Sequence, residues 1–140
     1  MIFIEIWEKV FEGKIPKEKY EMLLQNGEQD GLIITLSSVR HNVFINFGAV
    51  SIIRMLDEGI VLNGLFDDKQ IEEFRKHGFD NTIYQILDGE LDGFVREIGG
   101  DLCDCLNFKH YIIISLNFIV EIITEWEPNI IIENKCVYPK

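Results

Sequence analysis

The sequence predicts an α+β fold, in which two or three helices pack against a mostly antiparallel β-sheet. Strand-like segments outnumber helical ones, and the helical segments do not alternate strictly with the strands. The 140 residues, 47% of them hydrophobic, suffice for one domain with a substantial core. No repeat or Pro-, Gly- or Ser-rich linker divides the chain, so we expect a single domain over residues 1–140.

The N-terminal segment predicts a strand followed by a short helix. Residues 2–7 alternate apolar and polar side chains, as a half-buried strand does. In residues 17–25, Tyr20, Leu23 and Leu24 fall at helical spacing, and an Asn-Gly pair follows as a helix stop.

The next three segments predict a meander of three or four antiparallel strands. Residues 32–37 and 43–47 are short apolar or alternating runs separated by a polar turn. Residues 50–56 fit a strand or a helix. We favour a strand, because Gly48 and the turn at residues 57–59 bracket the segment at strand length.

Two further helices are predicted in the second half of the chain. Residues 67–77 begin with Asp67 as N-cap and Gln70 in a capping-box position. Residues 90–98 carry apolar side chains at i, i+3, i+4 and i+7, as an amphipathic helix does. Residues 82–87 read as a strand between these helices.

The most hydrophobic stretch, residues 110–126, predicts a buried hairpin. Its β-branched residues lie on both sides of Leu116-Asn117, which favours two strands and a tight turn over one helix. A membrane span needs about 20 apolar residues; this run is shorter and contains Glu121, so we expect no membrane insertion. Residues 130–133 predict one more short strand.

Alternation along this hairpin separates two faces. One face carries Glu121, Ile123, Glu125 and Glu127, and the other carries Val120, Ile122, Thr124 and Trp126. We expect the second face to be core and the first to be acidic toward Trp126. A Trp flanked by acids is an effective anchor on an Arg- or Lys-rich surface. A solvated sheet face is the alternative.

The charge is strongly acidic, with a net value of −11. Residues 57–104 hold 13 acidic and four basic side chains, a local net charge of −9. Such a field repels nucleic acid and anionic membrane and attracts a cationic protein, although it also fits a solubilising surface. The candidate partner-binding residues are Asp57, Glu58, Asp88, Glu90, Asp92, Glu121, Glu125, Trp126 and Glu127.

A calcium loop is not expected at Asp88. The acids at Asp88, Glu90 and Asp92 and the following glycine match the start of an EF-hand loop. The twelfth position, where a bidentate Glu is needed, is Gly99. An acid-rich first turn of a helix explains the pattern better.

A zinc site is not expected either. Cys103, Cys105 and His110 could supply three ligands, with Cys136 or His77 as the fourth. Structural zinc sites show two closely spaced ligand pairs, and here there is one. We therefore predict no metal and no cofactor.

No catalytic motif is present, which favours a binding protein over an enzyme. The chain lacks a G-x-S-x-G elbow, a P-loop and a G-x-G-x-x-G fingerprint. The alternative is a small enzyme or ligand-binding domain that uses the Cys103/Cys105/His110 loop or a carboxylate pair.

An odd number of cysteines and an acidic, non-basic start without a signal peptide predict a cytoplasmic protein with free thiols.

Three segments carry a resemblance to a known class of proteins: residues 43–59, 90–100 and 110–128. Their order, a strand pair ending in an acidic turn, a helix, and a hairpin closing on an aromatic-acid-Pro corner, resembles immunity proteins of bacterial contact-dependent growth inhibition and polymorphic toxin systems. The resemblance implies a stoichiometric inhibitor that binds the toxin domain of a neighbouring gene and blocks its active site or its substrate groove. We expect the protein to be a monomer or a homodimer. Many such toxins are nucleases with basic surfaces, which an acidic protein would complement.

Overall fold

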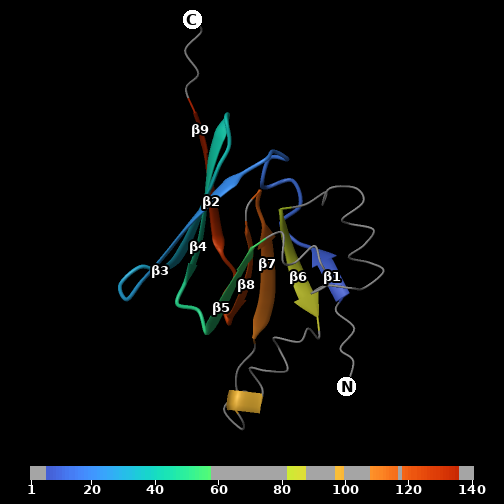
Figure 1. The fold of residues 1–140 in the computed structure, drawn as a ribbon, viewed down its shortest axis with the longest axis vertical. Coiled ribbons are helices and arrows are strands. Elements are labelled where there is room, and N and C mark those ends of the chain that lie inside the picture. Colours follow the sequence, from blue (N-terminus) through green and yellow to red (C-terminus); the bar gives the residue numbers. More distant parts are fainter. Residues whose placement is uncertain (1–5, 58–81, 88–96, 100–107, 117, 136–140) are drawn as a thin grey trace, which may run out of the picture.

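The computed structural model describes residues 6–57, 82–87, 97–99, 108–116 and 118–135, and these form two antiparallel β-sheets (Figure 1). The five-stranded sheet has the order β1-β6-β7-β8-β5, and the four-stranded sheet has the order β2-β3-β4-β9. The strands are β1 (Ile6–Lys9), β2 (Glu21–Gly27), β3 (Gly31–Ser37), β4 (His41–Gly48), β5 (Ile52–Asp57), β6 (Ile83–Leu87), β7 (Lys109–Ile114), β8 (Phe118–Thr124) and β9 (Asn129–Asn134).

The predicted α+β class is therefore wrong: the described part of the chain is nearly all β. In place of helices on one face of a sheet, two sheets pack face to face (Figure 1). The strand predictions at residues 32–37, 43–47, 50–56, 82–87 and 130–133 and the hairpin at residues 110–126 are confirmed.

The helix predicted at residues 17–25 is wrong, because this segment leads into strand β2. Met22 and Leu24 are half-buried against the core and Leu23 between them is 57% exposed, which is the alternation of a strand. Pairing with β3 along its whole length overrides the helical preference of the Leu- and Glu-rich sequence.

The other predicted helices fall largely on parts of the chain that the structure does not describe. Residues 67–77 and 90–96 lie outside the described ranges, and residues 97–99 are helical. None of the helical residues described here forms a segment long and apolar enough to cross a membrane.

The predicted meander is also interrupted, because β5 crosses to the other sheet. Strands β3 and β4 form a hairpin, but β5 pairs with β8. The chain leaves β4 at Gly48, whose φ of +69° favours glycine. A Cβ atom on Gly31 would lie 2.2 Å from the Gly48 carbonyl carbon, so the β2–β3 turn and this crossing fit together only with glycine at position 31.

The main core lies between the two sheets. It comprises Ile15, Tyr20, Leu32, Ile34, Leu36, Val43, Ile45, Phe47, Ile83, Tyr111, Ile113, Val120 and Ile122. Alternate residues of each strand contribute, as expected for two aligned antiparallel sheets. The Phe47 and Tyr111 rings, one from each sheet, lie 5.8 Å apart between centroids and join the layers.

The outer face of the five-stranded sheet is buried as well. A second cluster there contains Trp7, Tyr84, Ile86, Ile112 and Ile119. Burial on both faces explains why β7 and β8 are almost continuously apolar in sequence.

Candidate functional site: the acidic end of the sandwich

Three connections meet at one end of the sandwich: the β2–β3 turn, the β4–β5 crossing and the β8–β9 connection. The Thr124 hydroxyl donates to the Ala49 carbonyl at 3.2 Å, and the Ser51 amide donates to the Ile123 carbonyl at 2.8 Å. These bonds fix the β8 end to the crossing. We call this region the acidic end, defined by Glu28, Asp30, Glu125, Trp126 and Glu127.

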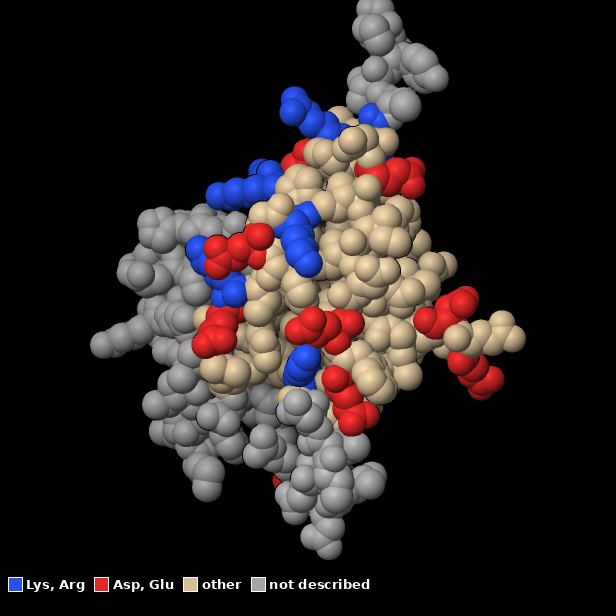
Figure 2. Space-filling view, turned by 180° about the vertical axis from the view of Figure 1, so that it is seen from behind, with Lys and Arg blue, Asp and Glu red and all other residues tan. Residues whose placement is uncertain are grey.

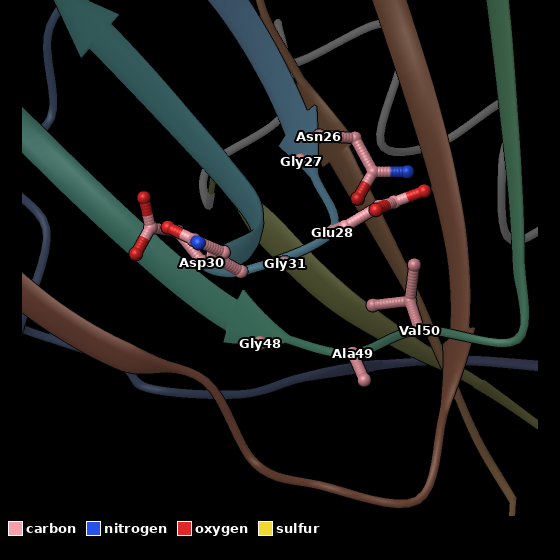
Figure 3. Close-up of a pocket in the computed structure, with 9 residues that line it drawn as sticks. Asn26, Gly27, Glu28, Asp30, Gly31, Gly48, Ala49 and Val50 are labelled. Carbon is pink, nitrogen blue, oxygen red and sulfur yellow. The ribbon is translucent and has the colours of Figure 1, made fainter.

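A pocket of about 400 Å³ opens beside the β2–β3 turn (Figure 3). It is lined by Asn26, Gly27, Glu28, Gln29, Asp30, Gly31, Gly48, Ala49 and Val50. Figure 3 shows Glu28 and Asn26 on the side of Val50, whereas Asp30 points to the other side of the turn. The two carboxylates therefore do not converge on one point. Among the described residues, no group of three His, Cys, Asp or Glu side chains could hold a metal ion.

Trp126 is the largest exposed apolar side chain at this end, with 57% of its surface accessible. Its predicted place on the core face is therefore wrong, because β8 ends at Thr124 and the strand alternation stops there. Its amide donates to the Thr124 hydroxyl at 3.3 Å, so the connection that presents the indole is tied to the end of β8. Glu125 is partly exposed and the Glu127 side chain is 68% exposed. Lys109 lies 3.5 Å from Glu127 and offsets part of its charge.

Glu121 has a different environment from Glu125 and Glu127, which lie beyond Thr124, where β8 ends. It is fully buried in the middle of β8. Its Oε2 accepts from the Arg54 guanidinium, and its Oε1 lies 3.1 Å from His110 Nε2. The carboxylate is thus neutralised inside the protein and is not presented to a partner.

The other predicted partner residues do not gather at this end. Asp57 ends β5 opposite Phe118, at the start of β8 and away from Glu125. Glu58, Asp88, Glu90 and Asp92 lie outside the described residues, as do the predicted ligands Cys103, Cys105, Cys136 and His77. His110 is described, and it contacts Glu121.

A basic end, defined by Lys17, Lys19, Arg40 and Lys135, lies at the opposite end of the strands. Figure 2 shows Lys and Arg side chains gathered toward the upper end of the molecule. The Lys135 ammonium donates to the Ser38 carbonyl at 2.7 Å, which ties β9 to the β3–β4 turn. Lys17 and Lys19 are close together in the sequence, whereas Arg40 and Lys135 join them only in the fold.

Glu18 lies within this basic end, between Ser38 and His41. Its Oε2 accepts from the Ser38 hydroxyl and its Oε1 lies 2.9 Å from His41 Nδ1. The bonds from Ser38 and then His41 hold the pKa of Glu18 below its usual value. Because the carboxylate separates the hydroxyl from the imidazole, the group does not form the serine–histidine pair of a nucleophilic enzyme.

Comparisons with known proteins identified no relative of this chain. No family model matches the sequence, and no curated protein or solved structure is significantly similar to it.

Proposed function

We propose that this protein binds a basic partner protein at its acidic end. The most concrete form of the proposal is an immunity protein that neutralises a cationic, nuclease-type toxin in the cytoplasm by occluding its active site or substrate groove. The observation that carries it is the exposed Trp126 held between Glu125 and Glu127.

Trp126 has the properties of an interface anchor. Tryptophan is enriched among the residues that dominate binding energy, where truncation costs about 2 kcal/mol or more. Its backbone is fixed by the bond to Thr124, which limits the entropy lost when a partner covers it. A lysine or arginine on the partner can contact the indole face and the flanking carboxylates together.

The flanking acids supply attraction over a longer range. Exposed carboxylates accelerate association with a basic protein, and this contribution falls as salt screens it. The net charge of −11 adds to the same field. A partner that normally holds nucleic acid presents such a basic surface.

The test is a titration against the cognate toxin domain that we expect the neighbouring gene to encode, at low and high salt. We expect tight one-to-one binding that weakens with salt, and a further loss in the double charge reversal Glu125→Lys/Glu127→Lys. The double reversal Glu8→Lys/Glu12→Lys, at two exposed acids in β1 and the β1–β2 segment, is the matched control and should leave most of the affinity intact. Binding that is insensitive to salt and to the double reversal would overturn the proposal.

A further inference from the structure

The outer face of the four-stranded sheet presents an apolar row to solvent. Leu23, Thr35, Phe44 and Ile131 stand directly opposite one another across β2, β3, β4 and β9. Leu23 is 57% and Ile131 is 54% exposed, and Phe44 is partly exposed. We call these four residues the central row.

Two further rows flank the central row on the same face. The acid row is Glu21, Ser37, Asn42 and Glu133, and the amide row is Gln25, Ile33, Asn46 and Asn129. The central and amide rows carry no charge, although the protein as a whole has a net charge of −11. Figure 2 shows a broad area without Lys, Arg, Asp or Glu on the side of the molecule from which the β2–β3 turn projects.

The charges beyond these rows are opposite at the two ends of the strands. Lys19, Arg40 and Lys135 lie past the acid row, four or five residues from the central row. Asp30 lies past the amide row at a similar separation, and its side chain points away from Val50, whereas Glu28 lies on the side of Val50 (Figure 3). At about 3.3 Å per residue, these charges lie roughly 13–17 Å from the central row. The face is therefore close to electrostatically self-complementary about that row.

We propose that this face pairs with a second copy of the chain, about a two-fold axis parallel to the central row. This axis reverses the strand direction, so the central row packs on itself and the acid row meets the partner's amide row. It also brings the turn with Glu28 and Asp30 toward the partner's basic end. Such an isologous contact closes as a dimer.

The charges select this axis over the other simple one. A two-fold axis along the strands would place Glu21 opposite the partner's Glu133, and like charges in contact oppose association. The selected axis places Glu21 opposite the partner's Gln25 and Glu133 opposite the partner's Asn129, whose amide groups can donate to carboxylates. Two sheets in this arrangement pack about 10 Å apart through their side chains.

The oligomeric state tests the proposal. Light scattering on the full chain should give twice the 16.3-kDa mass of the monomer. The double variant Leu23→Lys/Ile131→Lys should be monomeric and should retain its melting temperature, because both side chains are exposed. Val39→Lys, at an exposed apolar residue in the β3–β4 turn, is the matched control and should remain dimeric. A monomeric wild-type protein, or a double variant that still dimerises, would overturn the proposal.

Crosslinking tests the axis. With a short bis-maleimide, Leu23→Cys should crosslink to itself more than the wild-type cysteines do, because each Leu23 faces its counterpart. If Leu23→Cys crosslinks only when mixed with Ile131→Cys, the axis runs along the strands and the proposed geometry is wrong. The sheet-face variants leave Trp126 unchanged, so toxin binding reports on the proposed function independently.

Discussion

The middle of β8 and the connection that follows it use the same residue type for opposite purposes. Glu121 is fully buried and ion-paired with Arg54, whereas Glu127 is 68% exposed in the connection beside Trp126. Extending the alternation of the strand assigns both carboxylates to one face, but β8 ends at Thr124 and Glu127 follows it. Whether an acid lies inside the strand or in the connection after it therefore decides whether it stabilises the fold or can meet a partner.

The buried Glu121 carboxylate is satisfied by residues from the two strands that flank β8. Arg54 on β5 stands directly opposite Glu121, and His110 on β7 approaches from the other side. A buried carboxylate without such partners would be strongly unfavourable. The network therefore belongs to the sheet, and we expect it to influence stability more than binding.

The largest expected effect comes from breaking this network. Glu121→Ala leaves the Arg54 and His110 side chains without their shared carboxylate, and removing one member of a buried pair costs about 3–5 kcal/mol. Urea unfolding should show this loss, while Glu127→Ala should change stability by no more than about 0.5 kcal/mol. Equal, small effects of the two substitutions would remove the distinction between the two carboxylates.

A smaller loss of stability is expected from substitution of Gly31, which lies where the β2–β3 turn approaches Gly48. Gly31→Ala places a methyl group 2.2 Å from the Gly48 carbonyl carbon at a φ of +70°. The strain should cost about 1–3 kcal/mol in the free energy of unfolding. Gly27→Ala is the matched control, since a Cβ atom there meets no atom within 4 Å. If both variants are equally stable, the close approach of turn and crossing is incorrect.

The smallest expected effect is on the free energy of unfolding at alkaline pH. It involves Tyr111 in the core and Glu127 in the connection after β8. Burial, followed by the charge of Glu127, raises the pKa of Tyr111 to about 12. A raised pKa contributes stability that is present below the ordinary value of 10.0 and is lost as pH rises toward 12. Tyr111→Phe should flatten this alkaline decline, and Glu127→Gln should lower the pKa of Tyr111, measured by tyrosinate absorbance. A tyrosinate titration that Glu127→Gln leaves unchanged would show that the Glu127 charge does not reach the core.

The sequence predicted most strands because their alternation and bracketing turns are local signals. Residues 17–25 were predicted as a helix because their Leu and Glu residues suit a helix as well as a strand. Pairing with β3 makes the segment from Glu21 a strand. The sequence of β5 also does not show which sheet the strand joins. The segment fits either sheet, and its pairing with β8 is seen only in the structure. The helix predicted at residues 17–25 contributed to the incorrect α+β class, and the path of β5 concealed the second sheet.

The candidate site was predicted only where it is continuous in the chain. Glu125, Trp126 and Glu127 are adjacent, so an aromatic residue between acids could be recognised directly. Arg54 and Glu121 are 67 residues apart, and their pairing depends on a register that no short motif encodes. The turn with Glu28 and Asp30 is also distant from Trp126 in the sequence. The two lie at the same end of the sandwich because of the strand order of the sheets, which no short motif encodes.

The most direct test of the proposed function is calorimetric titration of Trp126→Ala against the cognate toxin domain that the proposal expects the neighbouring gene to encode. We expect a Kd at least about 30-fold higher than that of the wild-type protein, corresponding to roughly 2 kcal/mol, with an unchanged free energy of unfolding. A Kd equal to that of the wild-type protein would contradict the proposed function.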